Sequence, residues 1–429
     1  MKASSLGALA HRDFRLLWSG LVVSAVGSWV QDVADGWLLL QMTNSPLLVG
    51  LKGAFTAIPF ITASFLAGAL ADRLNRRLLV ACAQSAYVLA ATAEGMLVFT
   101  GHIQVWQIYV FGSINWSIAA IDAAARQALV PALVPREDLS SAIALMSSLR
   151  RGSSIIGPVI GGLTVATIGI GAAYFVNAFS FVPVVIAALA LRARPVVPKA
   201  AAESLARSML SGLRYSVAHA VIGGLLVVEA GQSLFQPIIT LMPVFARDVL
   251  HVGPDSYGLM LSMMGLGALT ATFSLVLLGS RVVQGRYAIA AAAIYPAVLI
   301  AFATSRNFHL ALACLLLLGM ADILGGTLRN TIIQIQVEEG YRGRIMGLLS
   351  TANRGTSGLG AVPIGALAVP LGAPLAMSLG GVMAFATAAL VTLRIPQILS
   401  FTATGYKVQQ AETAAALETG LPAPVEASI

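Results

Sequence analysis

Long apolar segments separated by short polar ones run along the whole chain. About 20 apolar residues are enough to cross a bilayer as a helix, and charges, prolines and glycines bound each segment here. The pattern predicts helices near residues 15–41, 48–71, 78–100, 105–130, 142–166, 170–191, 220–246, 256–279, 287–304, 308–333, 345–369 and 373–394. We therefore expect an all-α polytopic membrane protein with twelve transmembrane helices.

A polar stretch in the middle of the sequence divides the expected helices into two sets of six. The predicted organisation is an N-terminal six-helix half (1–191), a cytoplasmic linker (192–219), a C-terminal six-helix half (220–396) and a mostly disordered cytoplasmic tail (397–429). The tail is rich in alanine and glutamate, which favours disorder. The linker contains the run Ser204 to Ser216, which is suited to a surface helix.

The two halves also repeat each other. The segment Leu145–Gly157 aligns with Leu348–Gly360 at an offset of 203 residues, and the same offset carries Arg126 onto Arg329. Agreement at two separate places with one offset is hard to attribute to chance. It predicts two parallel six-helix repeats, an arrangement typical of secondary transporters.

Composition and charge agree with a membrane protein. Of the 429 residues, 58% are hydrophobic and 10% are charged, whereas soluble chains carry about 25% charged residues. Eighteen lysines and arginines fall on the segments expected to be cytoplasmic, and only Lys52, Arg247 and Arg306 fall outside. This asymmetry predicts cytoplasmic termini. It also explains the net charge of +8 through contact with anionic lipid, so no nucleic-acid partner is expected.

Several motifs resemble a known family. The loop Gly68–Arg77, which reads Gly-Ala-Leu-Ala-Asp-Arg-Leu-Asn-Arg-Arg, resembles the inner-loop signature of the major facilitator superfamily, with Asn75 where glycine is usual. The segments Phe14–Gly20, Ala125–Leu139 and Pro243–Leu250 resemble the bacterial exporter branch that includes enterobactin and macrolide exporters. The resemblance implies a monomer of the bacterial inner membrane that exports siderophores or amphipathic drugs, commonly driven by protons.

The fifth predicted helix carries a run of small residues around a proline. It is similar to the glycine-proline motif in helix 5 of drug/proton antiporters and comprises Gly152, Gly157, Pro158, Gly161 and Gly162. Small residues let neighbouring helices approach closely, and a proline removes a backbone hydrogen bond and kinks the helix. Ordinary helix packing is the alternative explanation.

Three of the acids within predicted membrane helices are candidates for proton coupling. A charge at the bilayer centre costs at least about 2.5–3.5 kcal/mol, so it needs a partner or a function. Asp32 and Asp35 share one face of the first helix, and two close carboxylates in a low dielectric resist being ionised together. With Glu229 of the seventh helix, they are the predicted proton-coupling residues. The alternative is an early helix end that leaves both aspartates at the outer surface.

The resemblance also implies which residues meet the substrate, because helices 1, 4, 7 and 10 line the central cavity of major facilitator proteins. The implied cavity residues are Gln31, Trp37, Asp122, Gln232, Gln236, Asp322 and Asn330. For Asp122 an ion pair with Arg126 at an inner gate is the competing interpretation, and lipid contact competes for Trp37. The implied inner gate consists of Gly68, Asp72, Arg73, Arg76, Arg77, Arg126, Arg151, Arg329 and Arg354.

Other classes of function lack sequence support. The chain has no phosphate-binding glycine loop, no His/Cys cluster with metal spacing and no nucleophile constellation,. We therefore expect neither an enzyme nor a cofactor or metal. The prediction is a proton-coupled exporter of a small amphipathic compound, and an importer or a lipid or lysolipid flippase on the same fold stays open.

Overall fold

The computed structural model describes residues 6–192, 205–279 and 283–402 and is helical nearly throughout these ranges. The first six long helices are α1 (Arg12–Thr43), α2 (Pro46–Arg73), α3 (Arg76–Phe99), α4 (Val105–Leu129), α5 (Leu139–Thr167) and α6 (Ile170–Ala190). The others are α7 (Leu205–Ala218), α8 (Ala220–Phe235), α9 (Ile238–Val244), α10 (Pro254–Leu278), α11 (Gly285–Thr304), α12 (Phe308–Gln336), α13 (Arg342–Leu371), α14 (Ala373–Arg394) and the short α15 (Gln397–Ser400). A π-helical turn, Phe245–Val249, continues α9.

The helices account for the predicted membrane spans. Ten helical segments among the described residues are long and apolar enough to cross a membrane, and the segment Ala220–Val249 joins α8, α9 and the π turn into one of them. The remaining two long helices, α5 and α13, have 29 and 30 residues. Both carry arginines in their first half and many glycines, which lower their mean hydropathy. Within the described residues the fold is thus the expected one of twelve transmembrane helices in two repeats.

Helix ends follow from local sequence. Asn44 adopts a left-handed conformation (φ 48°) that ends α1, and Pro46 occupies the first turn of α2 behind the capping hydroxyl of Ser45. Asn75, the departure from the loop signature, has φ −64° and caps α3 by accepting a hydrogen bond from the Arg77 amide (3.1 Å). An amide side chain suits this N-cap position, so the loop needs no left-handed residue here.

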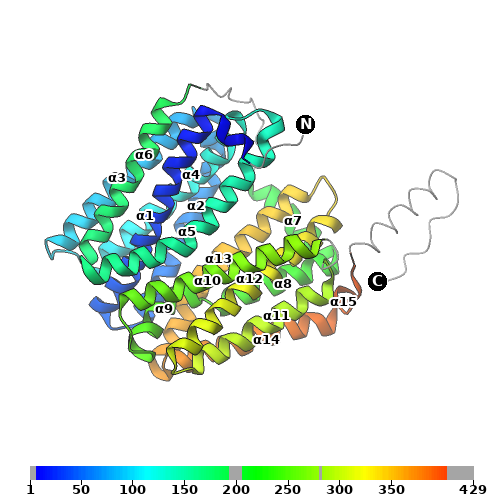
Figure 1. Cartoon of the computed structure of the whole chain (residues 1–429). Coiled ribbons are helices and arrows are strands. Elements are labelled where there is room, and N and C mark those ends of the chain that lie inside the picture. The colour runs from blue at the N-terminus through cyan, green and yellow to red at the C-terminus, as the bar shows by residue number, and fades with distance from the viewer. Residues whose placement is uncertain (1–5, 193–204, 280–282, 403–429) are drawn as a thin grey trace.

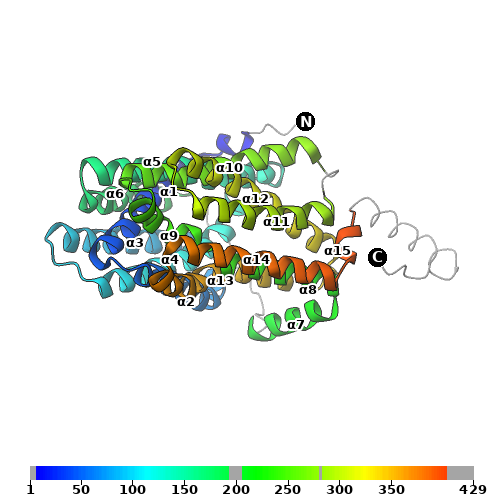
Figure 2. The same ribbon diagram turned by 90° about the horizontal axis from the view of Figure 1, so that it is seen from below.

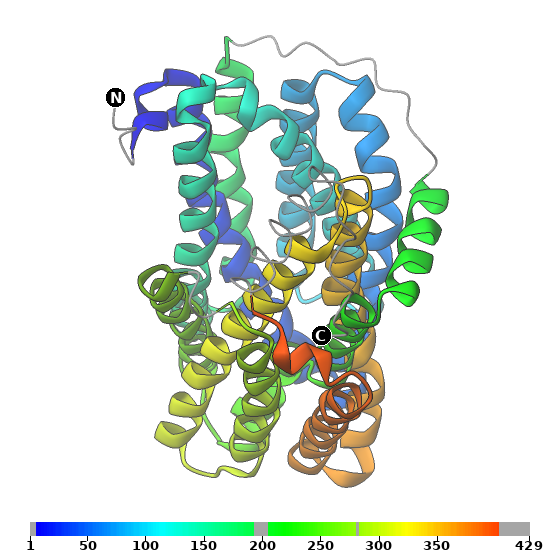
Figure 3. The same cartoon turned by 90° about the vertical axis from the view of Figure 1, so that its right-hand side faces the viewer.

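The two halves contact each other along two related seams (Figure 3). In one seam α5 packs on α10, where a Cβ on Gly258 would overlap the Pro158 carbonyl. In the other, α13 packs on α2, where a Cβ on Gly50 would overlap the Ala361 carbonyl. Pro158 and Ala361 are related by the 203-residue offset. Glycine permits this approach of backbone to backbone in both seams.

The helix-5 motif serves two contacts at once. Gly157 and Gly161 lie against Trp29 and Val30 of α1, while Gly162 lies against the start of α10. Gly152 has open space beside it. The motif therefore joins α5 both to its own half and to the other half, as expected of small residues in membrane helices.

The two ends of the bundle differ in packing. We call the end where α1 begins the linker face and the end where α1 finishes the far face. One apolar cluster near the far face includes residues of both halves, such as Leu39 and Phe245. Near the linker face each half has its own cluster, around Phe14 in one half and Ile332 in the other. The halves are closed at the far face and separate towards the linker face (Figure 1).

The linker helix α7 lies along the outside of the C-terminal half (Figure 2). Its Tyr215 stacks on Tyr341 with ring centroids 4.3 Å apart. The Arg344 guanidinium donates a hydrogen bond to the Ser211 hydroxyl (3.0 Å). These contacts fix α7 to the first turn of α13 at the linker face.

Arg247, in the π turn, provides a polar connection between the halves at the far face. Its guanidinium donates to the Leu40 carbonyl (3.0 Å) and to the Asn44 side-chain oxygen (2.8 Å) at the end of α1. Asp248 binds the same guanidinium at 2.6 Å and holds it in place. These bonds close the far face and have to break before that face can open.

Arg247→Ala should therefore shift the protein towards a state that is open at the far face. Hydrogen bonds to charged groups contribute about 1.5–3 kcal/mol each, so we expect the population to change by at least about tenfold. Spin labels at His102 and His309 would report the distance between the halves in a variant lacking Cys82 and Cys314. The exposed Arg306, replaced in the same way, is the control, and an unchanged distance distribution in Arg247→Ala would contradict the prediction.

Candidate functional site

Helix α1 presents a buried polar side chain to α3 and α6. The Gln31 amide donates to Glu94 Oε2 (2.9 Å) and its oxygen accepts from the Asn177 amide (2.5 Å). All three residues are buried, and Glu94 Oε1 has no hydrogen-bond partner in the described structure. Gln31 therefore lies inside the N-terminal half, away from the cavity in which the sequence placed it.

Asp35 lies one turn further along α1 and is neutralised by a cation. Lys52 of α2 approaches it at 3.2 Å, and the Tyr174 hydroxyl donates to its other oxygen at 2.7 Å. The helix continues to Thr43 and Asp35 is buried, so the idea of an early helix end is wrong. Lys52, expected at the outer surface, instead reaches into the bundle.

Asp32 has a different environment although it is only three residues away. It is exposed, and it forms no hydrogen bond or ion pair with any described residue. Gly36, one turn further on the same face, lies under the Tyr257 hydroxyl of α10. Asp32 is thus an unneutralised carboxylate beside the boundary between the halves, on the side that opens to the linker face.

The fourth helix holds an ion pair within one turn. Arg126 binds Asp122 at 2.7 Å, and the Asp122 side chain is only 2% exposed. The Gln84 amide lies beside the same carboxylate. This geometry is that of the intrahelical pair considered above, and it leaves Asp122 buried in its own half.

The C-terminal half contains a pocket of about 180 Å³. It lies where α8 ends at Phe235 and α9 begins at Ile238, and the interrupting residue Gln236 lines it. Discontinuous membrane helices often form binding sites, because the break leaves polar groups that can serve a ligand. Gln236 is 7% exposed, and its Nε2 has no hydrogen-bond partner in the described structure.

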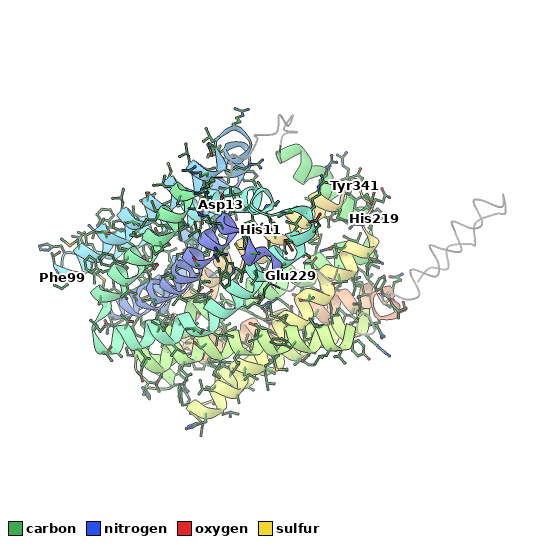
Figure 4. The ribbon with its side chains drawn as sticks, turned by 45° about the horizontal axis from the view of Figure 1, so that its top comes forward. His11, Asp13, Phe99, His219, Glu229 and Tyr341 are labelled. Carbon is green, nitrogen blue, oxygen red and sulfur yellow. The ribbon has the colours of Figure 1, made fainter. Side chains whose placement is uncertain are left out.

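A second buried ion pair forms one wall of this pocket. Glu229 binds Arg329 of α12 through bonds of 2.7 and 2.8 Å, and it accepts a further bond from the Asn353 amide of α13 (2.5 Å). Figure 4 places Glu229 between Phe99 at the far face and Tyr341 at the linker face. Glu229, predicted to couple protons, is therefore already paired with a cation. Arg329, assigned to the inner gate from sequence, lies in this pair.

Asp322 of α12 also lines the pocket and is not neutralised by contact. It is exposed and has no hydrogen bond or ion pair within the described residues. Arg151 of α5 exerts an electrostatic influence on it from the other half. Each half thus has one carboxylate without a bonded partner on its inner side, Asp32 in the N-terminal half and Asp322 in the C-terminal half.

The other predicted cavity residues lie in three different environments. Gln232 lines the pocket and donates to the Ala292 carbonyl (3.0 Å). Trp37 is buried near the far face, where it stacks on Tyr257 with centroids 6.0 Å apart. Asn330 accepts a hydrogen bond from Gln334 on its own helix (2.7 Å). Only Gln232 of these three faces the pocket.

The residues predicted to form an inner gate are not gathered into one cluster. Arg77 donates to the carbonyls of Leu189 and Leu191, and Arg76 donates to that of Ala128, all within the N-terminal half. Gly68 and Arg73 are exposed at the end of α2. The side chains of Asp72 and Arg354 lie outside the described part of the structure. No ion pair between described residues joins the halves, as expected where they are apart.

Comparison with known proteins identifies the fold and the family. The sequence profile named "Transmembrane secretion effector" matches residues 3–420. The chain belongs to this family. Its members are major facilitator transporters rather than enzymes.

Several similar proteins are named as enterobactin exporters. The enterobactin exporter EntS of Shigella boydii is 27% identical over 369 residues, covering 83% of this chain and 85% of the relative. The EntS protein of Citrobacter koseri is 26% identical over 357 residues with the same coverage. The chain is thus a helical membrane transporter similar to siderophore exporters.

Solved structures with the same fold include several transporters. A bacterial homologue of the lysosomal transporter Spinster, inward-facing and unoccupied, has a TM-score of 0.71 at 14% identity and covers 89% of this chain and 97% of its own. A bacterial homologue of ferroportin has a TM-score of 0.67 at 17% identity, with coverage of 91% and 99%. These structures establish the fold.

Sequence reasoning missed the partners of the buried acids. Lys52, Glu94 and Asn353 each belong to one of the three buried polar networks but were not proposed as site residues. The signal for Glu94 was available, since an acid within the predicted span 78–100 needs a partner as much as Asp32 does. The pairing itself joins distant parts of the chain and requires the fold.

Arg329→Met should destabilise the protein strongly, because it leaves Glu229 charged and buried. Breaking one side of a buried pair costs about 3–5 kcal/mol, whereas replacing both partners can be neutral. The thermal unfolding temperature in detergent should therefore fall sharply for Arg329→Met and recover in the double variant Glu229→Gln, Arg329→Met. Asp255→Asn, which changes an exposed acid at the far face, serves as the control. A double variant no more stable than Arg329→Met would contradict this view of the pair.

Proposed function

We propose that this chain is a proton-coupled exporter of a small amphipathic compound, of the siderophore or drug class, that works by alternating access in the bacterial inner membrane. The exporter relatives favour the outward direction of transport. The observation that carries proton coupling is the free carboxylate of Asp32 at the boundary between the halves. Asp35 and Glu229 were candidates as well, but each is already neutralised by a basic side chain.

A free carboxylate at this boundary can couple protons to the movement of the halves. Closing the linker face would remove water from Asp32, and an unneutralised charge inside membrane helices costs at least about 2.5–3.5 kcal/mol. A neutral Asp32 lets the boundary pass through the closed, dehydrated state, whereas ionised Asp32 keeps the linker side open and hydrated. For an inward proton gradient to drive export, Asp32 takes up the proton while the far face is open and releases it at the linker face, and the outward step occurs with substrate bound in place of the proton.

The direction of the cycle follows if the linker face is cytoplasmic, as the distribution of lysine and arginine favours. The present state is then inward-facing and ready to take substrate from the cytoplasm. Closure of the linker face would bring the basic loops around Arg73, Arg76 and Arg77 towards the other half, which is the role assigned to the inner gate.

The orientation can be tested by cysteine labelling in intact cells. In a variant without Cys82 and Cys314, a cysteine at His102 on the far face should react with a membrane-impermeant maleimide. A cysteine at Glu137 on the linker face should react only after the membrane is opened. Labelling of Glu137→Cys in intact cells would reverse the proposed orientation.

Proton coupling can be tested with Asp32→Asn in proteoliposomes. We expect the loss of substrate accumulation driven by a pH difference, because the variant cannot bind or release the coupling proton. Downhill exchange of substrate should persist, since exchange requires no net proton movement. Asp255→Asn should behave like the wild type in both assays. Accumulation against a gradient by Asp32→Asn, driven by pH alone, would disprove the assignment.

A further inference from the structure

Some polar groups that line the pocket in the C-terminal half are hydrogen-bonded to each other, and others have no partner. Arg329 directs its Nε and Nη2 atoms to Glu229, and the Asn353 amide is engaged with the same carboxylate. The Asp322 carboxylate and the Gln236 Nε2 atom, in contrast, have no partner among the described residues. The pocket therefore offers one free anion and one free amide donor, while its own cation is already occupied.

We propose that Asp322 and Gln236 form a subsite for the protonated amine end of an amphipathic substrate. An ammonium group donates to the Asp322 carboxylate, and charge-assisted hydrogen bonds of this kind are among the strongest in proteins. Gln236 Nε2 donates to a carbonyl or ether oxygen close to the amine. A buried amide without a hydrogen bond is unfavourable. Gln236 therefore favours a substrate that supplies an acceptor at this position.

The rest of the lining suits the apolar part of such a compound. Ile238, Ile239 and Met264 lie in the same pocket. An apolar body with a few directed polar contacts is the usual composition of a small-molecule site. The pocket volume of about 180 Å³ suits one end of a substrate whose remainder extends towards the open linker face.

Charged groups around Asp322 come from three helices. Glu229 and Arg329 neutralise each other, and Arg151 of α5 influences Asp322 from across the boundary without a bond to it. If Arg151 were the true partner of Asp322, the subsite would be a gate contact instead. The effect of removing Arg151 on ligand binding separates these two assignments.

This inference rests on the proposed exporter function, because it names the substrate class of that transporter. It adds a constraint to the cycle: a substrate ammonium and a proton both neutralise a carboxylate at the same boundary. The relatives are named for export of enterobactin, and the free carboxylate here favours a cationic compound over an anionic one.

Binding at constant pH tests the subsite independently of transport. The probes are phenylalaninamide, which carries an ammonium next to a carbonyl, and N-acetylphenylalanine, which has the same ring but a carboxylate. Isothermal titration of the purified full-length protein in detergent should give binding of phenylalaninamide roughly tenfold or more tighter than of N-acetylphenylalanine. Asp322→Asn should remove this preference and Asp322→Glu should retain it. Gln236→Leu should weaken phenylalaninamide binding.

Two further variants make the outcome decisive. Asp255→Asn, at an exposed acid of the far face, should keep the preference, and Arg151→Gln should bind phenylalaninamide at least as tightly as the wild type. Equal binding of both probes, binding of neither, or loss of binding in Arg151→Gln would overturn the subsite. If the preference holds while pH-driven accumulation by the wild type fails, proton coupling is disproved and the subsite stands.

Discussion

A charge inside membrane-spanning helices has to be neutralised, and this requirement organises the interior of the protein. Three of the buried membrane acids, Asp35, Asp122 and Glu229, each have a basic side chain at 2.7–3.2 Å, and a fourth, Glu94, accepts a hydrogen bond from the Gln31 amide. The pairs of Asp35 and Glu229 fix neighbouring helices within a half, because breaking a buried pair is unfavourable. Asp32 and Asp322 are the described membrane acids exposed at the boundary without such a partner, so their charge depends on what binds there.

The repeat explains how two similar halves acquire different chemistry. Arg126 and Arg329 occupy equivalent positions in the two repeats. Arg126 pairs with Asp122 on its own helix, whereas Arg329 pairs with Glu229 on α8. The second arrangement draws α12 to the interrupted helix α8–α9 and leaves a pocket beside the pair. The first leaves the charge buried within one helix. The equivalent arginine thus forms a pair within one helix in one half and borders a ligand-sized space in the other.

Most of the fold was predictable from sequence, while only part of the site was. Helix positions follow from runs of apolar residues, and the 203-residue offset indicates the duplication. Both can be read from the sequence because they are properties of consecutive residues. The locations of Asp32, Gln236 and Asp322 also follow from this pattern. The pairing of Asp35 with Lys52 does not, because it depends on how two helices turn towards each other. A residue such as Gln31 can therefore be assigned to a cavity helix and still face the interior of its half.

The contacts between the halves determine which of these groups can act during the conformational change. Along both seams glycines face backbone, so the halves can tilt without disrupting interlocked side chains. The far face is closed by a shared apolar cluster and by Arg247, and these contacts are lost when that face opens. Contacts that form when the linker face closes must compensate for the free energy of these lost contacts. Arg76 and Arg77 are already bonded within their own half, so the balance between the two states depends on whether the carboxylates at the boundary are neutralised.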